Sequence, residues 1–540
     1  MKKLILLFLI YYSLNIKITA QNITPDPWTD YCGWHYGNTP EWGGWVRDYI
    51  RNHTGYDLIS FEGEELSLDT SKLETLYSTL SEVDPSIDIL QLDGGLGQAK
   101  DTTKARKFIE MIQSDYAALW KDVIYQQSLK LTQLPNSEER VYYQLGNEIG
   151  SEALSAAIHY AIGHGYNGSE YDKSIIPVFA DFYLAPTIEA IEKASLDAYG
   201  ESGRIKIALG SINNAYNGPA KSFTDSLLNY SINNIYTETL EGSKVKDYID
   251  IITVHYMVGN LSSNQWEFKL DSYLDYIGEG RIKGVWSTEE IGINRALSGF
   301  GTSTGTHATM RYLHKAVENN YNSNVVRTNY YGWNTGPVGT TLQTINQELF
   351  DFFGKTKLQA LNPGIGYDDP INQGEEIYAF STENRKKAII VSLTSWSNLY
   401  QLSKEEWPSI SNIEAIKYTT ENNFVISTSL TENTTHYDLR IYESDFSDPG
   451  IILFKIEFDE STFTAYKISN SIQISPNPVL NQLHIATEEI IKDILVIGMD
   501  GKTTFINPDT NVDMTGFPNG IYTVVITTDK NTYTEKIIKQ

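Results

Sequence analysis

Two strand-like segments of this sequence end in glutamates that could act as a pair. The first, at 141–145, is rich in β-forming residues and leads into Glu148. The second, at 284–288, leads into the adjacent Glu289 and Glu290. One carboxyl group can protonate a leaving oxygen while another stabilises the positive charge that develops beside it, which is the chemistry of glycosidic bond cleavage. Taken alone, Glu148 could instead be an ordinary residue at the start of a helix, favoured there by the helix dipole.

The elements that must position these glutamates alternate between strand and helix patterns. Further strand patterns lie at 31–36, 56–61, 87–92, 205–209, 248–257 and 324–331, and helix patterns at 103–119, 152–162, 177–199 and 306–318. Such alternation predicts an α/β fold with a parallel sheet, and eight strands can close into a (β/α)8 TIM barrel. Catalytic groups of such barrels lie at the carboxyl ends of the strands. On this count Glu148 ends the fourth strand and Glu290 follows the seventh, so that both can face the barrel mouth.

The two strand ends resemble the catalytic motifs of clan A glycoside hydrolases, which are retaining enzymes built on this barrel. Asn147 and Glu148 are similar to the acid/base signature, and Asn147 is then implied to bind the sugar 2-hydroxyl, although it could simply cap a turn. The later segment is similar to the nucleophile strand, where glutamate is commonly followed by one residue and then glycine. Gly292 therefore selects Glu290 as the nucleophile, with Glu289 as the alternative because it follows a threonine.

Three further positions continue the resemblance in the order that clan A requires. His255 and Tyr256 end the predicted sixth strand and resemble a histidine that lines the sugar site and a tyrosine that supports the nucleophile. Trp333 follows the eighth strand and resembles the tryptophan platform beneath the bound sugar. The ordinary alternatives are a pair of satisfied core residues and a packed tryptophan.

The N-terminal part of the barrel is dense in aromatic residues between 26 and 49. Aromatic rings stack on sugar faces while their polar edges stay wet, so Trp34 is a candidate substrate-binding residue. The alternative is that these rings fill the floor of the barrel. The expected substrate is a polysaccharide.

The pattern changes after residue 352. Short alternating strands separated by polar turns predict a β-sandwich accessory domain at 353–466. The block at 467–540 begins with a Pro-Asn-Pro element at 476–478 and ends in a lysine-containing strand, which predicts a small β-sandwich. It resembles the C-terminal sorting domain of the type IX secretion system. The resemblance implies the type IX secretion machinery as a partner and no part in catalysis for this block.

Composition and charge argue against several classes of function and of site. The formal net charge of −26 argues against nucleic acid as a partner, because nucleic-acid binding needs a basic face. A single cysteine, Cys32, excludes an intramolecular disulfide framework and a cysteine-rich zinc site. The histidines form no His-Glu-x-x-His motif, so we expect neither a catalytic metal nor a cofactor.

The N-terminus predicts export. Residues 1–20 combine Lys2 and Lys3 at the start, an apolar segment and a small-residue end, as in a signal peptide, and leave 21–352 for the catalytic barrel. No later run approaches the roughly 18 apolar residues of a transmembrane segment, so we expect none in the mature chain. The expected location is the outer cell surface or the medium, reached through the periplasm.

Two competing functions stay open at this point. One is a non-catalytic carbohydrate-binding surface protein that keeps the barrel, against which the presence of both glutamates argues. The other is an inverting hydrolase, whose carboxyl groups lie about 6.5–9.5 Å apart instead of about 5–5.5 Å.

Overall fold

The chain folds into two compact units, one of residues Thr24–Asp459 and one that contains Glu460–Gln540. The predicted boundaries at 20, 352 and 466 stay predictions. The computed structural model describes residues 26–27, 32–36, 58–62, 88–92, 116–146, 148–162, 170–212, 215, 218–233, 237, 239–255, 263–289, 303–331, 337–361, 377–392, 399–407, 409–418, 423–442, 451–459, 472–475, 479, 481–487, 490–498, 503–507, 509–518, 520–529 and 532–539.

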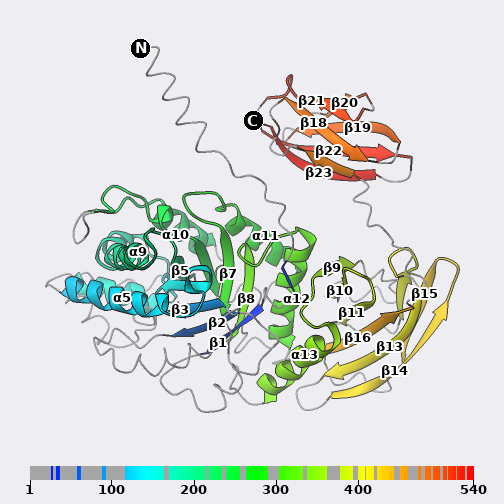
Figure 1. Ribbon diagram of the computed structural model, residues 1–540, viewed down its shortest axis with the longest axis horizontal. Coiled ribbons are helices and arrows are strands. Elements are labelled where there is room, and N and C mark those ends of the chain that lie inside the picture. Colours follow the sequence, from blue (N-terminus) through cyan, green and yellow to red (C-terminus); the bar gives the residue numbers. More distant parts are fainter. Residues whose placement is uncertain are drawn as a thin grey trace. The chain divides into compact units, whose positions relative to one another are not determined.

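Eight parallel strands form the barrel part of the larger unit (Figure 1). They pair in chain order, and β1 also pairs with β8, which closes the sheet into a barrel. The strands are β1 (Cys32–Tyr36), β2 (Leu58–Glu62), β3 (Asp88–Leu92), β4 (Val141–Leu145), β5 (Lys206–Ile212), β6 (Ile251–His255), β7 (Gly284–Glu289) and β8 (Val326–Tyr331). The predicted parallel sheet is confirmed, and each strand overlaps the segment that the sequence indicates.

The described helices of this unit lie between successive barrel strands along the chain or after the last one. They are α5 (Tyr116–Thr132), α6 (Ser137–Arg140), α7 (Glu152–Ala161), η3 (Lys173–Ile175), α8 (Ile176–Phe179), η4 (Ala180–Leu184), α9 (Ala185–Tyr199), α10 (Gly218–Leu228), η5 (Val245–Asp247), α11 (Ser263–Leu274), α12 (Ser303–Glu318) and α13 (Pro337–Phe353). The helix predicted at 103–119 is only partly described, and α5 continues 13 residues beyond it, to Thr132. The extension is stabilised by α9, because Lys121 binds Glu189 and the Tyr125 hydroxyl binds Asp197 at 2.8 Å.

The helical stretch 173–199 has the length and hydropathy of a membrane span. However, 78% of its most apolar window is buried inside the protein. Helices that are apolar all round are typical of the core of a large domain as well as of membranes. The burial makes this stretch a core helix of the barrel unit.

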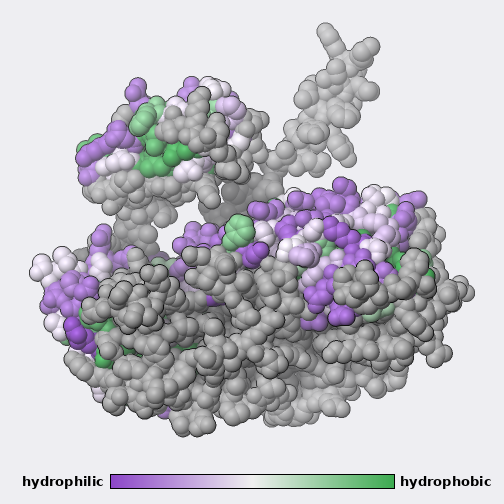
Figure 2. Space-filling model, turned by 180° about the vertical axis from the view of Figure 1, so that it is seen from behind, coloured by the Kyte–Doolittle hydropathy of each residue, from purple (hydrophilic) through white to green (hydrophobic). Residues whose placement is uncertain are grey.

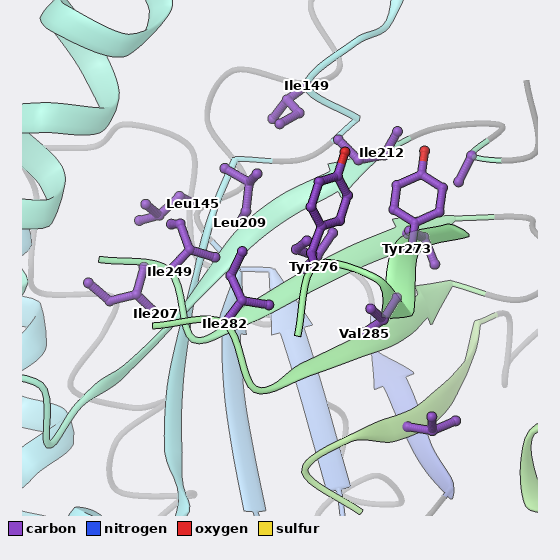
Figure 3. Packing of buried hydrophobic residues seen from close by; sticks show 14 of the residues in the cluster. Leu145, Ile149, Ile207, Leu209, Ile212, Ile249, Tyr273, Tyr276, Ile282 and Val285 are labelled. Atoms are coloured by element: carbon purple, nitrogen blue, oxygen red, sulfur yellow. The ribbon is translucent and has the colours of Figure 1, made fainter. Parts of the chain in front are cut away.

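The barrel strands separate their side chains into two sets because successive residues point to opposite faces. Leu145, Leu209 and Val285 belong to the large buried cluster that strands and helices share, and Figure 3 shows them among its members. A second buried cluster contains Tyr142, Ala208, Ile251 and Trp286. The alternation along β7 therefore places Trp286 on the opposite face from Val285, inside the barrel.

An eight-stranded antiparallel sheet follows the barrel within the same unit, in the order β12-β15-β14-β13-β16-β11-β10-β9. Its strands are β9 (Leu358–Leu361), β10 (Ile377–Thr382), β11 (Lys387–Ser392), β12 (Leu399–Ser403), β13 (Ile410–Tyr418), β14 (Asn423–Glu432), β15 (His436–Tyr442) and β16 (Ile451–Phe458). The antiparallel strands are confirmed, whereas their division into two facing layers stays a prediction. The sheet packs on the barrel helices, because the His314 ring of α12 contacts Tyr378 and Phe380.

The C-terminal unit contains two antiparallel sheets. The first has the order β17-β18-β21 and the second β20-β19-β22-β23. The strands are β17 (Ile472–Ser475), β18 (Gln482–Thr487), β19 (Ile491–Gly498), β20 (Thr503–Ile506), β21 (Asn511–Asp513), β22 (Gly520–Thr528) and β23 (Thr532–Lys539). Leu483, Val512 and Val524 belong to one buried cluster that both sheets share, as expected for a small β-sandwich. On the larger unit, Figure 2 shows mostly hydrophilic residues over the described surface, in keeping with the net charge of −26.

A buried ion cluster stabilises the amino-terminal end of the barrel strands. Asp250, only 2% exposed, binds Arg281 at 2.8 Å and accepts a hydrogen bond of 2.9 Å from the backbone N–H of Ile207. Arg281 also binds Glu192 of α9 at 2.7 Å. The cluster therefore connects β5, the residue before β6 and the segment that leads into β7.

Replacing Asp250 should destabilise the barrel strongly. Asp250→Ala leaves Arg281 without one of its two carboxylates and should cost about 3–5 kcal/mol of unfolding free energy, as for other broken buried ion pairs. Denaturant unfolding of the larger unit measures this loss. The matched control is Glu201→Ala, which removes an exposed partner of Arg204 and should leave the unfolding midpoint nearly unchanged. A loss in Asp250→Ala no larger than that of the control would contradict the expected role of Asp250.

Candidate active site

Glu148 lies immediately beyond β4 in a backbone conformation that is uncommon for its residue type. Its φ is +49°, in the left-handed region, where side chains other than glycine pay a steric cost. The side chain is 19% exposed, so the carboxyl group is largely but not fully buried. Residues with a strained backbone cluster at functional sites, so the conformation of Glu148 at the end of a barrel strand indicates a functional role.

Two glycines allow the chain to turn at this point. Gly146 has a φ of +78° and so supports the turn after β4 without a side-chain penalty. Gly210 of β5 lies so close to β4 that an added Cβ would be 2.0 Å from the Leu145 carbonyl oxygen. A side chain at 210 would therefore force β4 and β5 apart.

Strand β5 holds the backbone of Glu148 directly. The backbone N–H of Glu148 donates to Ser211 Oγ at 2.9 Å, and the N–H of Ile149 donates to the Ser211 carbonyl oxygen at 3.0 Å. Ser211 is fully buried. Figure 3 shows Ile149 and Ile212 at the same end of the strands, beyond Leu145 and Leu209.

His255 connects Glu148 to strand β7. It is the last residue of β6 and is fully buried. Its Nδ1 lies 3.7 Å from Glu148 Oε1, and its Nε2 is 3.1 Å from the Thr288 hydroxyl. A carboxyl group, an imidazole and a hydroxyl from β4, β6 and β7 thus meet at the carboxyl ends of their strands, as the barrel prediction requires.

A further carboxylate lies near Glu148. Burial, and next the negative charges of Glu152 and Glu148, raise the pKa of Glu170. Its segment is held against the β4 turn, because the N–H of Tyr171 donates to the Gly150 carbonyl oxygen at 2.9 Å. Glu170 was not predicted, because its proximity to Glu148 depends on a contact between separate segments, Gly150 with Tyr171. The position of Ser211 in the sequence was a weak indication of a site residue, because Gly210 and Ser211 directly follow the strand predicted at 205–209.

The remaining predicted site residues are described only in part. Trp34 lies on β1, where its backbone pairs with Tyr330 of β8, and Glu289 closes β7 opposite His255. Nothing is described of their side chains. The other predicted residues, Asn147, Tyr256, Glu290 and Trp333, lie outside the described residues. The structure therefore brings together Glu148 and His255, and the rest of the predicted site stays a prediction.

Within the described ranges, no three or more histidine, cysteine, aspartate or glutamate residues are grouped so that they could hold a metal ion. The expectation of no catalytic metal and no cofactor stays a prediction. Among the described residues, His255 lies beside the Glu148 carboxyl group, and the charge of Glu148 acts on Glu170. These groups can position and exchange a proton without a metal.

The C-terminal unit has a match to a known family. Residues 473–540 match the family described as the secretion system C-terminal sorting domain. The C-terminal block is a secretion sorting domain. This confirms the resemblance noted for 467–540 and indicates export by the type IX secretion system to the cell surface or the extracellular space. The predicted signal peptide and the passage through the periplasm stay predictions.

Several solved structures of glycoside hydrolases are similar to the chain. A family 30 subfamily 8 xylanase from Clostridium acetobutylicum is 14% identical with a TM-score of 0.45, over 80% of this chain and 96% of that one. A family 30 endoxylanase from Clostridium papyrosolvens is 11% identical with a TM-score of 0.42, over 81% and 98%. An endo-β-1,4-mannanase double mutant from Cellulomonas fimi is 8% identical with a TM-score of 0.35, over 96% and 99%. No curated protein sequence matches the chain.

Deleting the sorting domain should change delivery without changing catalysis. A chain that lacks residues 471–540 should remain in the periplasm of its native host, while the wild type reaches the surface or medium. Cell fractionation with an antibody to the larger unit measures this, and a periplasmic enzyme serves as the leakage control. Delivery of the truncated chain to the surface would contradict a sorting role for this domain.

Proposed function

We propose that this protein is a secreted retaining glycoside hydrolase that cleaves a polysaccharide by double displacement, with Glu148 as the acid/base and Glu290 as the nucleophile. The observation that carries the proposal is the position of Glu148. It stands at the carboxyl end of β4 in a closed parallel barrel, in a left-handed conformation and 3.7 Å from the buried His255. An ordinary helix-terminal glutamate needs neither the strained backbone nor the buried neighbour.

The proposed reaction has two steps, and both carboxyl groups take part in each step. Glu148 donates its proton to the glycosidic oxygen as Glu290 attacks the anomeric carbon, which forms a glycosyl ester and releases the first product. Glu148, now a carboxylate, takes a proton from water as the water attacks that ester. The product regains the anomeric configuration of the substrate and both glutamates return to their starting states. His255, placed beside Glu148 Oε1, would orient its carboxyl group.

The alternation of β7 supports Glu290 over its neighbour. Trp286 lies in the interior cluster, and the Thr288 hydroxyl reaches His255. Glu290 shares this parity, whereas Glu289 shares the parity of the outward-facing Val285. The pairing of β7 with β6 shifts in register between Ser287 and Glu289. Counted from Thr288, whose hydroxyl reaches His255, alternation would direct Glu290 to the barrel mouth. Glu289 is the alternative nucleophile.

The other proposed substrate contacts keep the roles that the resemblance implies. Asn147 would bind the 2-hydroxyl of the sugar, Tyr256 would support the nucleophile, and Trp333 and Trp34 would stack on sugar rings. The sorting domain supports a substrate outside the cell, as expected for a polysaccharide that is too large to import. Double displacement by two carboxyl groups needs no metal and no cofactor.

An activity screen tests the proposal as a whole. Purified enzyme is incubated with plant and algal polysaccharides, and the first product anomer is followed by proton NMR before mutarotation. We expect hydrolysis of at least one polymer with retention of configuration. Initial formation of the opposite anomer would support an inverting hydrolase instead. Binding without any cleavage across the panel would support the non-catalytic carbohydrate-binding protein.

A further inference from the structure

We propose that Ser211 is a positioning residue that holds Glu148 in the geometry needed for proton donation, an inference that rests on the proposed function. Ser211 makes two hydrogen bonds to the segment, from the Glu148 N–H to its hydroxyl and from the Ile149 N–H to its carbonyl oxygen. The first bond is made by the residue whose φ is +49°, and the second by the residue that follows it. The hydroxyl thereby satisfies the N–H that the left-handed turn points towards β5.

The path of β5 explains why Ser211 is available to serve β4. The pairing of β5 with β6 is regular at Leu209 and resumes at Ile212, with a shift in register between them. Opposite this gap β6 advances only from Ile252 to Val254. Gly210 and Ser211 thus face one residue of β6, the geometry of a β-bulge, which occurs next to active sites and redirects side chains.

The close approach at Gly210 completes the arrangement. An added Cβ at this position would lie 2.0 Å from the Leu145 carbonyl oxygen and 2.4 Å from that of Gly146. Only glycine lets the bulge rest against the turn at this distance, and this places the Ser211 hydroxyl within 2.9 Å of the Glu148 N–H. The backbone direction at Glu148 is thus fixed from β5, while His255 of β6 lies beside its carboxyl group.

Loss of a residue that positions only the proton donor should change the kinetics in a specific way. Protonation matters when the leaving group is a poor one, and it matters little when the leaving group departs as a stable anion. Loss of the Ser211 hydroxyl should therefore lower turnover on poor leaving groups and spare good ones. A merely structural defect would lower turnover on both alike.

The experiment measures kcat/KM for a series of aryl glycosides, of the sugar identified in the polysaccharide screen, that differ in leaving-group pKa. Ser211→Ala should lose about 10- to 100-fold on the poorest leaving group, as expected for a misplaced catalytic group, and stay close to wild type on dinitrophenyl glycosides. Ser211→Cys, a near-isostere with a weaker acceptor, should shift in the same direction. It replaces Ser211→Ala in the test if the alanine variant does not fold.

The matched control is Ser195→Ala. Ser195 is also fully buried, and its hydroxyl accepts the backbone N–H of Arg204 at 2.8 Å, but it lies in α9. This variant should show no dependence on the leaving group beyond that of the wild type. Glu148→Gln is measured in the same series as the positive reference.

The outcomes separate the two proposals. A leaving-group-dependent loss in the Ser211 variants and in Glu148→Gln supports both. An equal loss of the Ser211 variants on all substrates, or no loss, overturns the positioning role while the Glu148→Gln result keeps the proposed function. If Glu148→Gln itself shows no dependence on the leaving group, the proposed function fails and the positioning role fails with it.

Discussion

Glu148→Gln should stay folded and lose about 10²- to 10⁴-fold in turnover on substrates with poor leaving groups. Glutamine keeps the shape of the side chain, but its amide is too weak an acid to protonate the departing oxygen. Steady-state kinetics on the natural polysaccharide and on aryl glycosides measure the loss. Activated aryl glycosides, whose departure needs no proton, should be cleaved with a much smaller loss.

A nearby carboxylate provides the control for this variant. Glu152 lies in the first turn of α7, and its charge acts on Glu170, as the charge of Glu148 does. Glu152→Gln makes the same chemical change in the same region and should keep nearly wild-type turnover on every substrate. Equal losses of Glu148→Gln on activated and unactivated substrates would remove Glu148 from the acid/base role.

Glu290→Gly should abolish turnover, and added azide should restore it. The variant lacks the carboxylate proposed to attack the anomeric carbon, and the vacated space would admit a small anion that attacks from the same side. Rates with and without azide, together with NMR of the glycosyl azide, measure the rescue. We expect the product to have the anomeric configuration opposite to that of the substrate.

The adjacent glutamate is the control for this experiment. Glu289→Gly changes the same side chain one residue earlier, at the end of β7, and should retain measurable activity without azide. If instead Glu289→Gly is inactive and rescued, while Glu290→Gly works unaided, the two assignments are reversed. The retaining mechanism would survive that reversal.

The parallel sheet could be predicted from the sequence because its signals are local. Runs such as 141–145 and 248–257 are nearly continuous apolar segments, as expected for strands buried on both faces. The meeting of Glu148 and His255 followed from the same reasoning, since residues that end parallel strands of a barrel gather at one mouth. For β1 and β2 the patterns were weaker, yet the strands occur near the predicted positions.

The support for Glu148 could not be predicted because it depends on register. Nothing in the order Leu209-Gly210-Ser211-Ile212 states that two of these residues face one residue of β6. The left-handed φ of Glu148 is equally hidden, since glutamate has no intrinsic preference for that region. Both features depend on how β5 pairs with β6 and approaches β4 in the folded barrel.

In the antiparallel sheet, the strands could be predicted from the sequence but their order could not. Strands β10, β11, β14 and β15 lie within the region predicted as a β-sandwich, 353–466, because alternation within each strand is local. Their order in the sheet depends on pairing across distant parts of the chain, such as β11 with β16. The packing of Tyr378 against His314 of α12 depends on the shape of both surfaces and left no periodic signal.

Trapping the covalent intermediate tests the two-glutamate retaining mechanism most directly. A 2-fluoroglycoside with a good leaving group, made from the sugar that the enzyme cleaves, forms the glycosyl ester but breaks it down slowly, because fluorine destabilises the oxocarbenium-like transition state. Mass spectrometry of a protease digest should place the label on Glu290, and Glu290→Gly should not be labelled. A label on Glu289 would reverse the nucleophile assignment. No label on an enzyme of confirmed activity would contradict the retaining mechanism.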